Sequence, residues 1–124
     1  MNTNLKNAVL EQIGISKKEF KNNASDYADA SNGVSGFIYC SDTHKFALDN
    51  QNEINNLLDE LADDQGIEVV ELVKSFGVFR GNMDKEELKD LYKFISGNKN
   101  IKQGSVTNVL AWLCVEQLSF ELNN

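Results

Sequence analysis

The last stretch of the chain, from Gln103 to Leu122, constrains the fold more than any other. It carries no charge from Gln103 to Val115, and its apolar residues recur at helical spacing on two opposite sides. A helix that is apolar nearly all round must be enclosed by a domain or by lipid. The uncharged run is too short to span a bilayer. We therefore expect residues 105–122 to form a buried central helix, with apolar side chains from two sets: Val106, Val109, Leu110, Leu113 and Phe120, and Ala111, Cys114, Val115, Leu118 and Leu122.

The rest of the chain reads as shorter helices packed around this one. Proline is absent, and 124 residues suit a single domain. Capping-box spacing at Ser16/Glu19 and at Asp84/Glu87 marks two helix starts. The sequence therefore predicts one all-α domain over residues 1–124, with five to seven helices. Residues 22–36 are expected to form an irregular polar loop, residues 36–40 a short apolar entry segment, and residues 67–76 a buried helix.

A long acidic helix is expected over residues 43–65. Candidate N-caps lie at residues 41–43, and Asn50-Gln51-Asn52 marks a candidate kink or break. The apolar side of this helix consists of Ala47, Ile54, Leu57, Leu58 and Leu61.

Charge is distributed unevenly along the chain. The net charge is −7, and residues 42–71 hold nine acidic residues against Lys45 alone. Proteins that bind duplex nucleic acid normally show the opposite sign, so we expect no direct nucleic-acid binding. No segment resembles a signal peptide or a membrane span, and two cysteines cannot form a disulfide framework. These features are typical of a cytoplasmic protein with buried free thiols.

The acidic side of the 43–65 helix is the leading candidate site. Asp49, Glu53, Glu60 and Asp64 form a stripe opposite the apolar side, and Asp59 and Asp63 lie beside it. Asp49/Glu53 and Glu60/Asp64 are like-charged pairs four residues apart, each destabilising by roughly 0.2–0.5 kcal/mol. No lysine is expected to relieve them, which suggests a face reserved for a cationic partner. The alternative is a solvated face that keeps an acidic protein soluble.

A magnesium site is the second candidate. Glu68-x-x-Glu71 and Glu87-x-x-Asp90 resemble the carboxylate pattern of the MazG-like family of all-α nucleotide pyrophosphohydrolases. Such a site needs carboxylates that converge between helices. Helical spacing instead places Glu71 opposite its helix's apolar side, and Asp90 away from a core stripe of Leu88, Leu91, Tyr92 and Ile95. We therefore expect no metal and no cofactor.

The remaining chemistry-bearing residues favour structural roles. Cys40 and His44 are four residues apart, but Cys40 lies in an apolar run and no orienting acid is evident beyond Asp42. Two cysteines and one histidine do not make a zinc site. Trp112 is expected in the core, while Phe79 and Arg80 could belong either to the core or to an interface.

Two stretches together resemble a family of short, acidic, uncharacterised proteins associated with bacteriophages, plasmids and other mobile elements. They are Ser35-Gly36-Phe37-Ile38-Tyr39-Cys40-Ser41-Asp42-Thr43-His44-Lys45-Phe46 and Asn108-Val109-Leu110-Ala111-Trp112-Leu113-Cys114-Val115-Glu116. The resemblance implies a setting, the cytoplasm of a bacterial host, and no activity.

These observations lead to one main hypothesis with two alternatives. The main hypothesis is a non-enzymatic accessory protein that inhibits a host defence complex, of the CRISPR or restriction type. Its acidic helix would dock into the basic groove of that protein or nucleoprotein complex. The alternatives are a magnesium-dependent MazG-like pyrophosphohydrolase, and an accessory protein that binds through an apolar or loop surface in residues 22–36.

Overall fold

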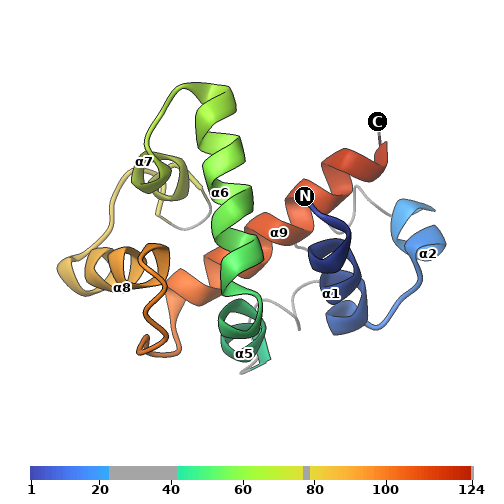
Figure 1. Cartoon of the computed structure of the whole chain (residues 1–124), viewed down its shortest axis with the longest axis horizontal. Helices are drawn as coiled ribbons and strands as arrows, with labels where there is room; N and C mark the ends of the chain where they lie inside the picture. The colour runs from blue at the N-terminus through green and yellow to red at the C-terminus, as the bar shows by residue number, and fades with distance from the viewer. Residues whose placement is uncertain (23–41, 77–78, 124) are drawn as a thin grey trace.

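Seven helices make up the described part of the computed structural model, which covers residues 1–22, 42–76 and 79–123. These residues contain no strand, so the expected all-α fold is confirmed. Most of the expected polar loop and the apolar run at 36–40 lie outside the described residues. In chain order the helices are α1 (Thr3–Ile13), α2 (Lys17–Asn22), α5 (Asp42–Asp49), α6 (Gln51–Gln65), α7 (Val69–Lys74), α8 (Lys85–Ile95) and α9 (Ser105–Asn123) (Figure 1).

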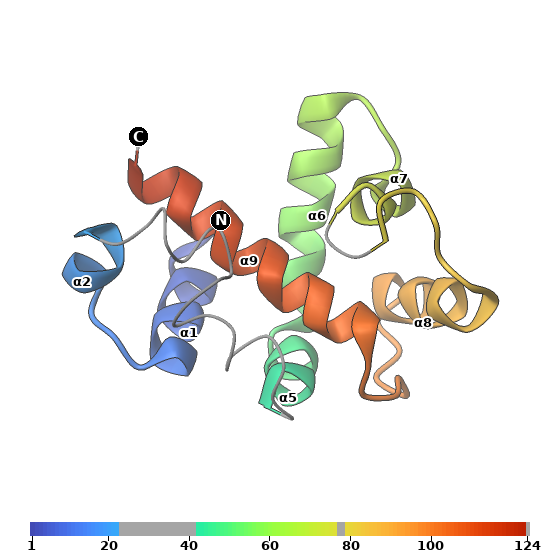
Figure 2. The same ribbon diagram turned by 180° about the vertical axis from the view of Figure 1, so that it is seen from behind.

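Helix α9 is the central helix that its apolar sequence predicts. It runs obliquely through the molecule, with α6 crossing it on one side (Figures 1 and 2). Helices α1, α2, α5 and α8 all contact it. Its side chains are enclosed on most sides, and five of its apolar residues are fully buried: Leu110, Ala111, Cys114, Val115 and Leu118.

One residue of α9 departs from the expected pattern. Val109 and Leu113 are buried, but Phe120, on the same side of the helix and two turns further on, is 64% exposed. The expectation that Phe120 lines the core was wrong. Helical spacing identifies the side of a helix, but not how far along its axis neighbouring helices cover it.

Local capping explains where the shorter helices begin. The Asp84 carboxylate accepts a hydrogen bond from the Glu87 amide at 2.8 Å, and Glu87 accepts one from the Asp84 amide at 3.1 Å. The Ser16 hydroxyl accepts a hydrogen bond from the Glu19 amide at 3.2 Å. Both predicted helix starts are therefore confirmed. Helix α7 is shorter than the expected 67–76 segment, and Ile67 is 40% exposed in the turn before it.

The core-facing side of α8 overlaps only partly with the expected one. Leu91 is buried and Ile95 packs against the core, as predicted. Phe94 is fully buried and Asp90 is only 8% exposed, whereas Tyr92 is 56% exposed. The predictions that Tyr92 belongs to the core and that Asp90 lies away from it were both wrong. The physical reason is that Phe94 and Leu91 direct the helix inward, and the polar hydroxyl of tyrosine tolerates the surface.

Side chains of α6 join it to the end of α8. The Gln51 amide nitrogen donates to the carbonyl oxygens of Phe94 at 3.0 Å and Asn98 at 3.1 Å. The Asn55 amide nitrogen also donates to the Phe94 carbonyl, at 3.0 Å. The last carbonyls of a helix have no partner within it, and both amides donate to one of these, the Phe94 carbonyl, while Asn98 lies just beyond the end of α8. They therefore fix α6 and α8 as neighbours.

Candidate functional site

The expected 43–65 helix is divided into α5 and α6 at Asn50. Both the backbone amide and the side-chain amide of Asn50 donate to the Phe46 carbonyl, at 3.1 and 2.9 Å. The Asn50 carbonyl then accepts the Ile54 amide at 2.9 Å, which begins the next helix. The break falls within the Asn50–Asn52 run that marked a candidate kink. Consequently Asp49 lies on α5, while the other five candidate acids lie on α6.

Asp49 also has a local partner, contrary to expectation. The Lys45 ammonium lies 2.5 Å from its carboxylate, one turn away on α5. The hydrogen bond and the charge of Asp49 raise the pKa of Lys45 above its ordinary value. The expectation that no lysine relieves this part of the stripe was therefore wrong, and Asp49 does not belong to the acidic surface of α6.

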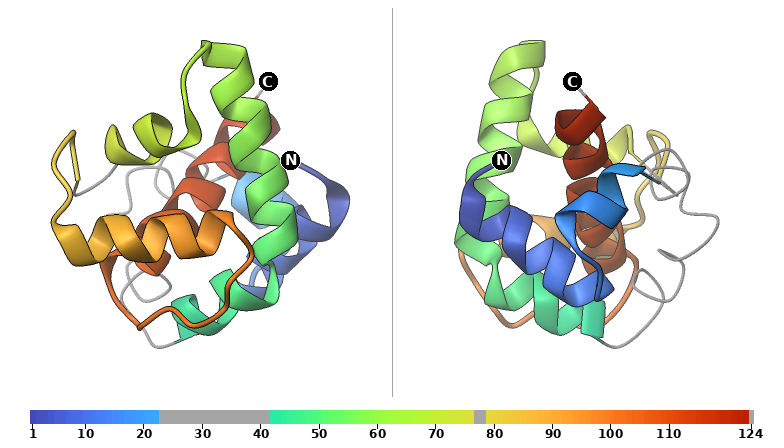
Figure 3. Two further views of the ribbon diagram at one scale, coloured as in Figure 1. Left: turned by 60° about the vertical axis from the view of Figure 1, so that its left-hand side comes forward. Right: turned by 90° about the vertical axis from the view of Figure 1, so that its right-hand side faces the viewer.

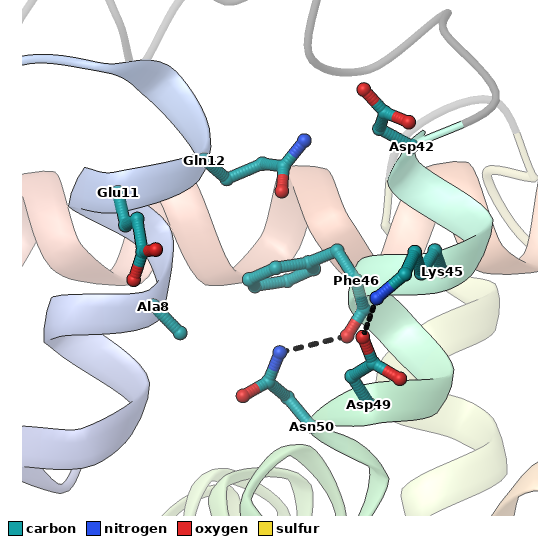
Figure 4. Close-up of a pocket in the computed structure, with 8 residues that line it drawn as sticks. All are labelled: Ala8, Glu11, Gln12, Asp42, Lys45, Phe46, Asp49 and Asn50. Carbon is teal, nitrogen blue, oxygen red and sulfur yellow. Dashed lines mark hydrogen bonds and ion pairs between the residues drawn. The ribbon is translucent and has the colours of Figure 1, made fainter.

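Asp49 instead borders a polar pocket between α1 and α5, shown in Figure 4. The cavity has a volume of about 320 Å³, and the Phe46 ring lies between the two helices, with Gln12 above it and Asn50 below. Phe46 is only 4% exposed, so the ring belongs mainly to the core. The lining residues are Ala8, Glu11, Gln12, Asp42, Lys45, Phe46, Asp49 and Asn50.

Helix α6 presents an acidic side to solvent. Ile54 and Leu58 are fully buried on its inner side. Its outer side carries five acidic residues and no basic one, and four of the five are exposed while Glu53 is half-buried. We define the acidic face of α6 as Glu53, Asp59, Glu60, Asp63 and Asp64.

The acids at the C-terminal end of α6 are placed where the helix itself disfavours them. Asp59/Asp63 and Glu60/Asp64 form two like-charged rows, each four residues apart, which costs roughly 0.2–0.5 kcal/mol per pair. The carboxylates of Asp63 and Asp64 also lie in the last turn, where the helix dipole is negative and no basic residue is present. The acidic face is therefore retained against local electrostatic repulsion.

The N-terminal ammonium is the one cation that forms an ion pair with this face in the described residues. It lies 3.8 Å from the Glu60 carboxylate and 3.2 Å from the Glu121 carboxylate of α9. Glu60 remains 68% exposed despite this contact. Beside it a groove of about 320 Å³ is bordered by Met1, Asn2, Glu53, Asn56, Leu57, Asp59 and Glu60. The acidic face therefore includes a concave edge.

Glu121 is the better-neutralised of these two carboxylates. Burial raises its pKa, but hydrogen bonds from Gln117, the N-terminal ammonium and Lys6 outweigh that effect, so the pKa lies below the ordinary value. The Gln117 amide donates at 3.0 Å, and the Lys6 ammonium lies 3.3 Å away. Glu121 thus joins α1 to α9 and serves a structural role.

The carboxylates of the second candidate do not converge. Glu71 has a 63% exposed side chain and lies 3.9 Å from Lys74, whereas Asp90 is buried. Glu87 is engaged in the helix cap and accepts a hydrogen bond from the Ser105 hydroxyl. Among the described residues, no three histidine, cysteine, aspartate or glutamate side chains are close enough to hold a metal ion.

The surroundings of His44 and Cys114 indicate structural roles for both residues. The Nε2 atom of His44 lies 2.7 Å from the Ile101 carbonyl, a distance at which the imidazole N–H donates. Cys114 is fully buried, and burial raises the pKa of its thiol to about 12. Cys40 lies outside the described residues, so its suggested pairing with His44 is not placed.

Phe79 is buried and Arg80 is exposed. Trp112 is half-buried and packs against the core, with its ring edge-to-face against Phe76 at 5.7 Å.

A second charged surface was missed from the sequence. Lys85, Lys89 and Lys93 follow one another at four-residue spacing on the outer side of α8, next to exposed Tyr92. The four-residue spacing of these lysines is visible in the sequence. Assigning Tyr92 to the core, however, predicts the wrong outer side for α8. The structure therefore carries an acidic surface on α6 and a basic surface on α8.

No helix within the described residues has the length and apolar character needed to cross a membrane. No curated protein and no solved structure matches the chain. One family model, described as a domain of unknown function (DUF7222), matches residues 2–124. Because this match spans almost the entire sequence, the chain belongs to the DUF7222 family.

Proposed function

We propose that this protein is a non-enzymatic binding protein whose acidic face of α6 occupies a basic groove on a nucleic-acid-handling complex. The observation that carries the proposal is the arrangement of Asp59, Glu60, Asp63 and Asp64. These carboxylates are exposed, form like-charged rows and crowd the negative end of their helix with no basic residue in its last turn. A partner with clustered lysine or arginine side chains relieves this repulsion when it binds.

The spacing of the carboxylates suits a surface that recognises phosphates. Residues four apart on a helix are separated by about 6 Å along its axis, and Glu53 and Glu60 by about 10 Å. A basic groove built for the closely spaced charges of a nucleic-acid strand can accept several of these carboxylates at once. The acidic face then excludes the nucleic acid by occupying its place.

The resemblance to proteins of phages and mobile elements is what supports a bacterial setting for this proposal. In a bacterial cytoplasm, the complexes that such elements need to disable are CRISPR effectors and restriction enzymes. The proposed activity is therefore inhibition by occupancy, and it requires no cofactor, no membrane contact and no nucleic acid bound to the protein itself. Complementary charge accelerates association and makes it sensitive to salt.

Plating efficiency tests this proposal. Bacterial strains that each carry one CRISPR or restriction system would express the wild type or the α6 variant, defined as Asp63→Lys with Asp64→Lys. We expect the wild type to restore phage plating in at least one strain and the α6 variant to lose that effect. A control with Glu11→Lys and Glu71→Lys changes the net charge equally, at exposed positions on α1 and α7.

The control variant should retain activity, since neither of its substitutions touches the acidic face. Equal activity of the α6 variant and the wild type would show that the acidic face is not the binding surface. Absence of protection in every strain would contradict the proposed class of target.

A further inference from the structure

The outer side of α8 is a basic surface with an exposed aromatic ring beside it. Lys85 and Lys89 are exposed, Lys93 is half-buried, and Tyr92 is 56% exposed beside half-buried Leu88. Together these side chains border an open depression. We define the lysine face of α8 as Lys85, Leu88, Lys89, Tyr92 and Lys93. An apolar centre with a charged rim is the usual composition of a protein interface.

The lysine face is not neutralised by acids of its own helix. Of the three acidic residues in α8, Asp90 is buried and Glu87 is engaged in the helix cap, which leaves only Glu86 exposed. Lys85 and Lys89 form no ion pair within the described residues, and the Lys93 ammonium donates only to the Asn100 carbonyl at 3.4 Å. The positive charge of this face is therefore available to a partner.

We propose that this partner is a second copy of the chain, which binds through the acidic face of α6. The lysines of α8 form one row at four-residue spacing, and the acids of α6 form two rows at the same spacing, Asp59/Asp63 and Glu60/Asp64. Rows of this kind interdigitate when two helices pack, so one row of lysines fits between two rows of carboxylates. The Tyr92 hydroxyl provides a further donor to a carboxylate.

The positions of the two helices allow both contacts to form at once. Helices α6 and α8 lie on the same side of the molecule, which faces the viewer in the left panel of Figure 3. Hydrogen bonds from Gln51 and Asn55 on α6 to the end of α8 hold the two helices next to each other. A two-fold axis through this side places α6 of each copy against α8 of the other, which gives a closed symmetric dimer with two equivalent contacts.

A nucleic acid is a less suitable occupant of the lysine face. The net charge of −7 repels polyanions at long range, and helix α6, which carries the acidic face, lies on the same side of the molecule as α8. A second copy of the chain avoids this repulsion. Its lysine face meets the acidic face of the first copy, and its acidic face meets the lysine face of the first copy. The complementarity is thus internal to the chain, and it does not depend on the proposed function.

Charge exchange between two variants tests the dimer. The α6 variant (Asp63→Lys, Asp64→Lys) carries basic residues on both faces, and an α8 variant (Lys89→Glu, Lys93→Glu) carries acidic residues on both. Sedimentation velocity of the purified wild type at high micromolar concentration should show salt-sensitive dimerisation. Each variant alone should dimerise at least about tenfold more weakly, because both of its contacts become repulsive. An equimolar mixture of the two should associate to within about threefold of the wild type.

Three outcomes would overturn this inference: a monomeric wild type at low salt, dimerisation that neither variant weakens, or a mixture that fails to associate. Binding of a labelled single-stranded oligonucleotide that is lost in the α8 variant would assign the lysine face to nucleic acid instead. Because the experiment uses purified protein alone, its failure leaves the plating result unaffected. The Glu11→Lys, Glu71→Lys control should dimerise like the wild type.

Discussion

Replacing Asp63 and Asp64 by lysine should make the protein more stable, although both residues belong to the proposed binding surface. Neither side chain forms a hydrogen bond or ion pair within the described residues, and both are exposed in the last turn of α6. The backbone contact that ends the helix, from the Gly66 amide to the Asp63 carbonyl at 3.1 Å, does not depend on the side chain. The substitutions therefore change electrostatics and little else.

The size of the effect follows from two terms. Each substitution removes a like-charged pair with Asp59 or Glu60 and creates an attractive one of the favoured orientation, with the acid preceding the lysine, at roughly 0.2–0.5 kcal/mol for each change. Each also places a positive charge at the negative end of the helix, which contributes roughly 0.3–1 kcal/mol at low salt. After screening at an exposed site, we expect a total gain of about 1–2 kcal/mol in the free energy of unfolding. The corresponding rise in Tm is roughly 3–10 °C.

Urea denaturation at low and high salt, at a protein concentration low enough for the wild type to be monomeric, measures this gain. The midpoint should rise without a change in the slope, and the gain should shrink markedly near 1 M salt, where the screening length falls to about 3 Å. A neutral variant, Asp63→Asn with Asp64→Asn, should show about half of the gain. A loss of stability, or a gain that does not depend on salt, would refute the claim that these carboxylates are held against repulsion.

Three further predictions concern the core and the helix junctions. Gln51→Leu removes the side-chain donor to the Asn98 carbonyl and one of the donors to the Phe94 carbonyl, which keeps Asn55, so the free energy of unfolding should fall by roughly 1–3 kcal/mol in urea titrations; no change would contradict the account of the α6–α8 junction. Cys114, whose pKa is raised to about 12, should resist iodoacetamide in the native protein at mildly alkaline pH and react in urea, as peptide mass mapping would show; equal native labelling would contradict its burial. The lowered pKa of Glu121 stabilises the fold above its unfolded pKa, near the ordinary value of 4.5, and this contribution is lost as the pH falls through the folded pKa. Glu121→Gln should therefore be less stable than the wild type at neutral pH, with the difference shrinking in acid; a difference independent of pH would exclude this ionic role.

The fold could be predicted from the sequence where a single local cause decides the structure. The uncharged helical pattern at 105–122 identified the central helix, and the Asp84/Glu87 spacing identified the start of α8. Both depend on residues close together in the chain, so no knowledge of tertiary contacts was needed.

The candidate site was harder to predict because it depends on how helices turn and end. Asn50 ends α5 through its own side chain, an interaction that helical periodicity does not reveal, and this removed Asp49 from the acidic surface. On α8, the predicted core side included Tyr92 and omitted Phe94, whereas Tyr92 is exposed and Phe94 is buried. The lysine row beside the exposed Tyr92 ring was therefore not identified from the sequence.

Affinity capture tests the central claim, that the acidic face of α6 binds a nucleic-acid-handling complex, most directly. Tagged wild type, the α6 variant and the Glu11→Lys, Glu71→Lys control would be incubated at low protein concentration with lysate of a strain that shows protection. The account predicts that the wild type and the control retain the same defence complex, that duplex DNA or high salt releases it, and that the α6 variant does not retain it. Equal retention by the α6 variant, or a complex that neither DNA nor salt releases, would contradict the claim.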